Sequence, residues 1–226
     1  MSDFGSTTRV WRKAAAIVGR YPAATVIPGA VLGAIAEAPH YFAGERLVMG
    51  YVLTYATAAL AYYLYLAYAE EIVLEYERET ERIGLRDVLR ELRDATSYVW
   101  RTLAAGLMTL VTTGVASGLL VIPGAWLYTR WSLAIPAIRH ENLGPAAALK
   151  RSNALVRSRF WFVFATATLA LAMEETLVHL GAVGGHLVSG SDTWGEWIGG
   201  SIVAAMAIPL AAFATSIAYQ RLARAS

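Results

Sequence analysis

The sequence lacks cysteine and contains only four histidines among its 226 residues. The absence of cysteine excludes disulfide frameworks, cysteine-ligated zinc, iron–sulfur clusters and thiol nucleophiles. Charged residues are also scarce, at 16%, against roughly 25% in a typical soluble domain. The 19 basic and 17 acidic residues nearly cancel, to a net charge of +2. Bulk charge therefore does not favour nucleic acid as a partner.

Apolar residues are in excess: 57% of the chain is hydrophobic and the mean hydropathy is +0.46. A helix needs about 20 mostly apolar residues to cross a bilayer. We therefore predict an all-α polytopic transmembrane helical bundle, formed by one integral membrane domain over residues 1–226. Six spans are expected, at about residues 22–38, 47–74, 99–122, 125–138, 160–183 and 197–219. The fourth is short and holds Arg130, so a re-entrant or tilted segment is the alternative to a full crossing.

The distribution of lysine and arginine predicts the orientation. With the N-terminus inside, 17 of the 19 basic residues fall in inner segments, while Arg46 falls outside and Arg130 lies within a span. Cytoplasmic segments carry such an excess of basic residues. We expect a multi-pass protein of the bacterial cytoplasmic membrane with both termini cytoplasmic.

A cleaved signal peptide is the alternative at the N-terminus, because the start is basic and residues 34–36 read Ala-Ile-Ala. Arg20, Pro22 and Pro28 interrupt the apolar run that such a peptide needs. The uncleaved first span is therefore the preferred interpretation.

Two inner segments are expected to form cytosolic amphipathic surface helices. In the first, apolar residues recur at helical spacing at Leu85, Val88, Leu89, Leu92 and Val99. The second begins at Gly144-Pro145, since proline suits a first helical turn. Its predicted apolar face consists of Ala148, Leu149, Ser152, Leu155 and Val156. Helices of this kind lie at the membrane surface or against a bundle.

Residues 122–164 carry a longer motif, with the sequence IPGAWLYTRWSLAIPAIRHENLGPAAALKRSNALVRSRFWFVF. A Pro-Gly turn precedes an aliphatic run that ends in Arg-Trp, then a proline leads to a glutamate and Gly-Pro-x-x-Ala-Leu-x-Arg-Ser opens a helix. The corresponding residues are Pro123, Gly124, Arg130, Trp131, Pro136, Glu141, Gly144, Pro145, Ala148, Leu149, Arg151 and Ser152. This stretch resembles the glycerophosphoryl diester phosphodiesterase membrane-domain family and related small bacterial integral membrane proteins. Ser158 departs from the pattern, where the family often has glycine.

The resemblance implies a membrane module of lipid or envelope biology. Hydrolysis in the full-length family members belongs to a separate metal-binding barrel, and six spans leave no room for a barrel in 226 residues. The resemblance therefore implies no catalytic activity here.

Arg130 is the first candidate site residue, because an arginine at the centre of a span costs about 2.5–3.5 kcal/mol to insert. Its planar guanidinium either holds a lipid phosphate or pairs with a bundle carboxylate such as Glu174. The predicted helix that begins at Pro145 is basic and supplies further candidates for binding a lipid phosphate. The lipid-headgroup candidates are Arg130, Lys150, Arg151 and Arg157.

Carboxylates and imidazoles gather at two outer helix ends. Glu175 and His179 are four residues apart and share a helix face, while Glu37 and His40 are three apart. The four residues suggest a divalent-metal or general-base site. Further contributors would be His186, Asp192 and Glu196. One observation opposes a metal site: Pro39 is expected to end the helix before His40, so Glu37 and His40 need not share a face. Hydrogen-bonded packing or a polar cavity is the alternative.

A stripe of tyrosines runs along the second predicted span. Tyr51, Tyr55, Tyr62 and Tyr65 fall within about 80° of one another on a helix, while Tyr63 and Tyr68 are expected to point elsewhere. Buried hydroxyls need partners, so these four tyrosines and Glu174 are candidates for a polar cavity. Packing and interface anchoring are the alternative.

Small-x-x-x-small spacings occur at Gly29/Gly33, Gly114/Gly118 and Gly195/Gly199. They allow close helix packing within one chain or between two chains, and the second case would be a homodimer. We expect a non-enzymatic module with membrane lipids as partners and a lipid-interacting, scaffolding or transport-associated role. The alternatives are an intramembrane metal-dependent hydrolase and a small-solute transporter. No cofactor is expected beyond the divalent metal of the hydrolase alternative.

Overall fold

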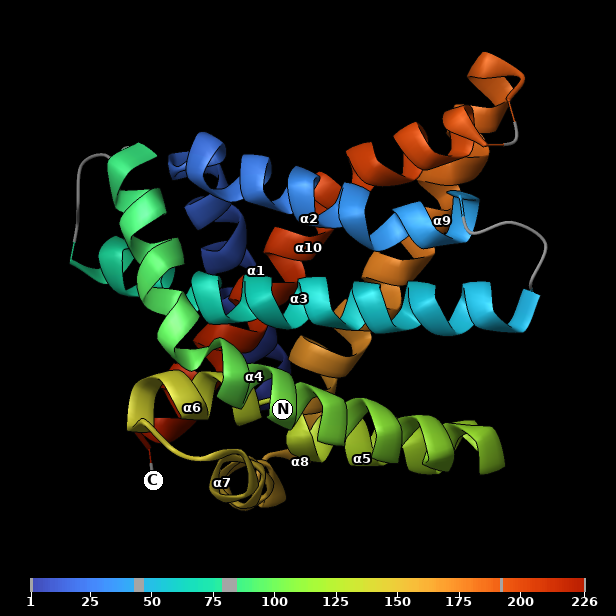
Figure 1. Cartoon of the computed structure of the whole chain (residues 1–226). Helices are drawn as coiled ribbons and strands as arrows, with labels where there is room; N and C mark the ends of the chain where they lie inside the picture. Colours follow the sequence, from blue (N-terminus) through green and yellow to red (C-terminus); the bar gives the residue numbers. More distant parts are fainter. Residues whose placement is uncertain (1, 43–46, 79–84, 192, 226) are drawn as a thin grey trace.

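The computed structural model describes the backbone of residues 2–42, 47–78, 85–191 and 193–225, and the side chains of residues 6–39, 57–78, 98–116, 120–191 and 193–225. Within these ranges the chain is helical and contains no strand, which confirms the predicted all-α class (Figure 1). The elements are α1 (Ser2–Arg20), α2 (Pro22–Phe42), α3 (Leu47–Glu77), α4 (Leu85–Leu119), α5 (Val121–Trp131), α6 (Ala134–Glu141), α7 (Pro145–Arg157), α8 (Phe160–Val163), the π-helix η1 (Phe164–Thr168), α9 (Leu169–Ser189) and α10 (Trp194–Ala223).

Four stretches among the described residues are long and apolar enough to cross a membrane. They are Pro22–Pro39, Tyr98–Ala116, Phe160–Ser189 and Trp194–Ala223. Each overlaps one predicted span.

Helix α10 lies at the centre of the bundle. In its membrane-length stretch 72% of the residues are buried, against 28–33% in the other three. It contacts α1, α2, α3 and α9, and its buried residues are mainly alanine and other small side chains. Small side chains let several helices approach one axis, so α10 organises the packing around it.

Helices α9 and α10 are in backbone contact through glycines. A Cβ added at Gly185 would lie 1.9 Å from the Gly195 carbonyl oxygen, and one at Gly199 would lie 2.2 Å from that of Gly181. On α2, a Cβ at Gly33 would lie 2.7 Å from the Ala204 side chain. The spacings at Gly29/Gly33 and Gly195/Gly199 therefore serve packing within one chain. Gly114 has nothing within 4 Å of an added Cβ, and the side-chain position of Gly118 lies outside the described residues.

Two helix boundaries differ from the prediction. Helix α4 joins the expected surface helix near residues 83–99 and the span 99–122 into one helix of 35 residues. Residues 125–138 are instead divided, since α5 ends at Trp131 and α6 begins at Ala134.

A serine of α7 explains the division. The Ser152 hydroxyl donates to the Arg130 carbonyl over 2.7 Å and accepts from the Leu133 N–H over 3.2 Å. A side chain that satisfies backbone groups in this way replaces the helical hydrogen bonds and permits a break. Residues 125–138 therefore do not form one straight crossing helix.

Helix α7 begins at Pro145, after a left-handed residue at Asn142 that ends α6. Asparagine is one of the few side chains that adopt this conformation readily. The buried residues of α7 are Ala148, Leu149, Ser152, Leu155 and Val156, and the helix packs against α4, α5 and α6.

Candidate functional site

A cavity of about 590 Å³ lies between α2, α3, α4, α5, α9 and α10. Its volume is within the range of small-molecule sites. Carboxylates, an imidazole, hydroxyls and tyrosine rings line it together with small apolar residues. The polar and aromatic lining residues are Glu37, Tyr62, Tyr63, Thr113, Tyr128, Glu174, Glu175, Thr176 and His179.

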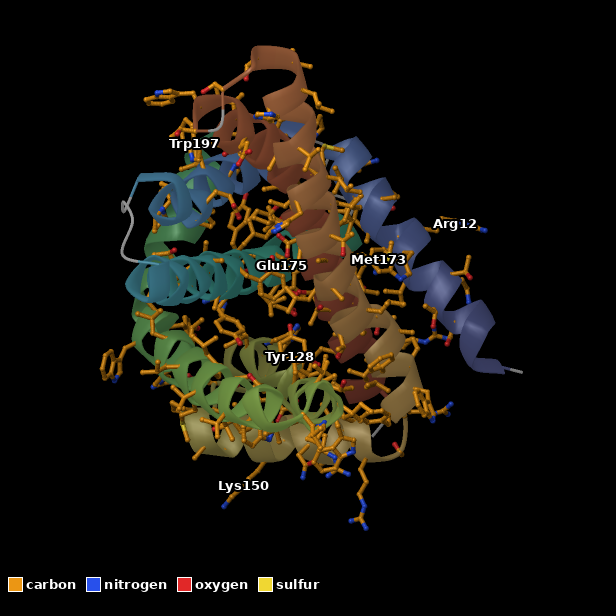
Figure 2. The ribbon with its side chains drawn as sticks, turned by 90° about the vertical axis from the view of Figure 1, so that its right-hand side faces the viewer. Arg12, Tyr128, Lys150, Met173, Glu175 and Trp197 are labelled. Carbon is orange, nitrogen blue, oxygen red and sulfur yellow. The ribbon has the colours of Figure 1, made fainter. Side chains whose placement is uncertain are left out.

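The acidic side of the cavity comes from two helices. Glu175 and His179 lie one turn apart on α9, and Glu174 lies beside them. Glu37 reaches the cavity from α2. Figure 2 shows Glu175 on the side of α9 that faces α3, with Tyr128 below it. Among the residues that the structure describes, the lining contains three carboxyl groups and no lysine or arginine. The cavity therefore has an acidic character.

Hydrogen bonds to the backbone of α2 hold Glu37 near the cavity. The Trp197 indole N–H donates to the Ala34 carbonyl over 3.0 Å, and the Thr57 hydroxyl donates to the Ala36 carbonyl over 3.2 Å. These two contacts connect α2 to α10 and α3. Since they lie within three residues of Glu37, they restrain the stretch of backbone that carries its side chain.

Tyrosines of α3 and α5 form another part of the cavity lining. The Tyr62 hydroxyl lies 3.3 Å from that of Thr215 and is also hydrogen-bonded to Tyr128. The rings of Tyr62 and Tyr63 meet edge to face, with centroids 6.0 Å apart. Tyrosine faces carry negative quadrupole density, which attracts cations.

The structure brings together five predicted residues. Tyr62 and Glu174 were expected in a polar cavity and Glu37, Glu175 and His179 at a metal or general-base site; all five line one cavity.

Tyr65 does not line this cavity, because it is fully buried and its hydroxyl donates to the Thr25 carbonyl over 2.8 Å. Tyr63 was expected to point elsewhere but lines the cavity, and Tyr128 was not predicted. The packing of α5 against α4 brings Tyr128 in, and no sequence spacing signals that packing. The side chains of Tyr51, Tyr55 and His40 lie outside the described residues.

Among the side chains that the structure describes, no three His, Asp or Glu residues are placed to hold a metal ion. The metal site with Glu37, His40, Glu175 and His179 stays a prediction. His186 forms a 3.8 Å contact with Glu196 in the region where α9 meets α10. Asp192 lies outside the described residues.

The predicted headgroup residues have different surroundings. Arg130 donates to Asn153 over 2.7 Å and lies 4.3 Å from the centre of the Trp126 ring, so Asn153 takes the place expected for Glu174. Arg151 is paired with Glu141 at 2.7 Å. Lys150 and Arg157 are exposed, and Lys150 extends away from the bundle in Figure 2.

A polar cluster that was not predicted joins α3, α6 and α10 at the opposite end of the bundle from the α9–α10 connection. Glu70, only 1% exposed, lies 2.7 Å from His140 Nε2 and 3.4 Å from the Gln220 amide. The hydrogen bond to Glu70 raises the pKa of His140, although burial of the imidazole opposes this. Nearby, Arg139 pairs with Glu71 and lies 4.4 Å from the centre of the Tyr98 ring.

Two further carboxylates at this end have basic partners. Burial alone would raise the pKa of Glu77, but the hydrogen bonds and charges of Lys13 and Arg224 hold it below its usual range. Burial of Glu141 is likewise outweighed by hydrogen bonds from Arg151 and Tyr219, which lower its pKa. The amide and carboxylate groups of this cluster therefore act mainly to connect helices.

Comparison with known protein families, curated proteins and solved structures finds no match for this chain. The resemblance of residues 122–164 to the phosphodiesterase membrane-domain family stays a prediction from the motif.

Proposed function

We propose that this chain is a multi-pass membrane protein that binds a small organic cation in its central cavity, in a binding or transport role. The observation that carries the proposal is the composition of the described lining, which has Glu37, Glu174 and Glu175 with tyrosine rings, and no lysine or arginine among the residues placed by the structure. Carboxylates attract a positive charge through space, and tyrosine faces add cation–π attraction. Such a lining would favour a cation and repel an anion.

The proposed topology has six spans in the cytoplasmic membrane of a bacterium. Besides the four stretches above, α3 would cross, because residues 47–69 contain no charged residue. At 11 residues α5 is about 16 Å long, half the thickness of the hydrocarbon core. In this proposal the sixth passage is completed by α5 and the first residues of α6, to about residue 138.

The arrangement of basic residues supports the proposed orientation. Lys13, Arg139, Arg151, Arg221 and Arg224 make ion pairs or hydrogen bonds at the end of the bundle where α1, α6 and the last turn of α10 meet. The positive-inside rule would place this end in the cytoplasm, together with both termini.

Equilibrium binding of tetraethylammonium to the full chain in a neutral detergent tests the proposal. We expect binding in isothermal titration calorimetry, and Glu174→Gln or Glu175→Gln to weaken it about tenfold or more, since a carboxyl contact with the cation is lost. Glu196→Gln removes the same charge outside the cavity and is expected to leave the Kd unchanged. Absence of binding to the wild-type protein, or equal weakening by all three substitutions, would overturn the proposal.

A further inference from the structure

Two neighbouring clefts open at the end of the bundle where α1, α8 and α10 meet. One has a volume of about 310 Å³ and the other about 260 Å³. Arg9 and Arg221 line both clefts, so the two are adjacent and share a basic wall. Neither overlaps the central cavity in its lining residues.

Basic side chains dominate the lining. Lys13 and Arg224 join Arg9 and Arg221 in the larger cleft, and Arg159 joins them in the smaller one. The acidic residue among the described lining residues is Glu77, in the larger cleft. Among the described residues, five basic groups against one carboxylate create an anion-attracting site, and the basic groups come from three separate segments of the chain.

Arg221 is held in place at the wall that the clefts share. Its guanidinium donates to the Ser6 carbonyl over 3.3 Å and lies 5.8 Å from the centre of the Phe162 ring. A guanidinium restrained in this way loses little conformational freedom on binding, and its planar donors match the oxygens of a phosphate.

The surroundings indicate a ligand that is partly apolar. The membrane-length stretch Phe160–Ser189 begins beside Arg159, and Trp161 is 73% exposed there. Exposed tryptophan next to arginine is typical of the headgroup region of a bilayer. Phe162 and Leu222 give the smaller cleft apolar walls.

We infer that the paired clefts between α1, α8 and α10 bind the phosphate of an anionic phospholipid headgroup. Basic pockets between helices on the cytoplasmic side bind such headgroups in other membrane proteins. The phosphate could also come from a soluble anion, but the adjoining Trp161 and the start of the apolar stretch favour the lipid. Placing the site in the cytoplasmic leaflet rests on the topology proposed above.

Native mass spectrometry of the full chain with phosphatidylglycerol or phosphatidylcholine tests this inference. We expect preferential retention of phosphatidylglycerol, and at least a fivefold loss of that retention in the double variant Arg9→Gln/Arg221→Gln. Arg12→Gln/Arg20→Gln is the matched control, because it removes the same charge from exposed side chains of α1 that line neither cleft. If the double variant does not fold, the single variant Arg9→Glu, at an exposed position of α1, tests the same loss of phosphatidylglycerol retention.

Unchanged phosphatidylglycerol retention in the variants that fold, or an equal loss in the control, would overturn the assignment of the lipid site to these clefts. Full competition by millimolar inorganic phosphate would overturn the lipid as its ligand. Tetraethylammonium binding, measured on the same samples, is expected to be unchanged by Arg9→Glu. A failure of the lipid site is therefore distinguishable from a failure of the cation site.

Discussion

His140 Nε2 and Glu70 Oε2 lie 2.7 Å apart and join α6 to α3 across 70 positions of sequence. The Glu70 side chain is 1% exposed, so this imidazole is a principal source of its hydrogen bonding, with the Gln220 amide at 3.4 Å. A buried carboxylate deprived of a partner keeps its desolvation cost. The pair therefore fixes how the cytoplasmic-side helices meet in the proposed topology.

Replacing His140 tests this role. We expect His140→Ala to destabilise the protein by about 1–3 kcal/mol, because Glu70 would stay buried without its histidine. Thermal unfolding in detergent measures the effect. His186→Ala removes a histidine whose 3.8 Å contact with Glu196 is partly exposed, and is expected to change the midpoint little. Equal midpoints for the two variants would contradict the assignment.

The same pair predicts a pH dependence. The pKa of His140 is raised in the folded protein by the hydrogen bond to Glu70, with further attraction from Glu71 and opposition from burial and Arg224. A group with a raised pKa contributes stability below its unfolded pKa and loses it as the pH rises through the folded value. We expect the midpoint difference between wild type and His140→Gln to be largest below the ordinary histidine pKa of about 6.5 and to shrink as the pH rises through the raised pKa of His140. A difference independent of pH would contradict this.

The contact of α9 with α10 predicts opposite effects at two neighbouring glycines. Gly185→Ala would place a Cβ 1.9 Å from the Gly195 carbonyl oxygen, so we expect a loss of about 1–3 kcal/mol. At Gly184 nothing lies within 4 Å, and alanine has the higher helix propensity. Gly184→Ala is therefore expected to be neutral or stabilising in the same unfolding assay. Similar losses at both positions would rule out the close approach as the cause.

Elemental analysis separates the proposed cation site from the metal-dependent alternative. If the cavity is built for an organic cation, purified wild-type protein should contain far less than one divalent metal ion per chain, as should His179→Ala. Near one metal ion per wild-type chain, lost in His179→Ala, would instead favour the hydrolase hypothesis.

The sequence was informative where the relevant spacing is local. The start of α7 at Pro145 and its buried residues follow from helical periodicity, as does the shared face of Glu175 and His179. The break near Ser132 could not be predicted, because it depends on Ser152 of another helix. The contact between Glu70 and His140 depends likewise on the relative positions of two helices. Such contacts require knowledge of the packing, which the spacing of residues in one segment does not contain.

The lining of the cavity could likewise be predicted only in part from the spacing within one segment. Helical spacing grouped Tyr62 with Tyr65, but packing places Tyr65 against the Thr25 carbonyl and brings Tyr63 and Tyr128 to the cavity instead. Angles around one helix axis do not show which neighbouring helix covers each face. The acidic residues were easier to find, because charge within an apolar segment is unusual wherever the segment packs.

Carbodiimide labelling of Glu175, with and without tetraethylammonium, reports where the cation binds. Glu175 is solvent-accessible and lines the cavity, and Glu196 lies outside the lining and serves as the internal control. We expect saturating cation to lower the labelling of Glu175 several-fold, as measured by peptide mass spectrometry, and to leave the labelling of Glu196 unchanged. Unchanged labelling of Glu175 at a cation concentration that saturates binding would contradict binding of the cation in the central cavity.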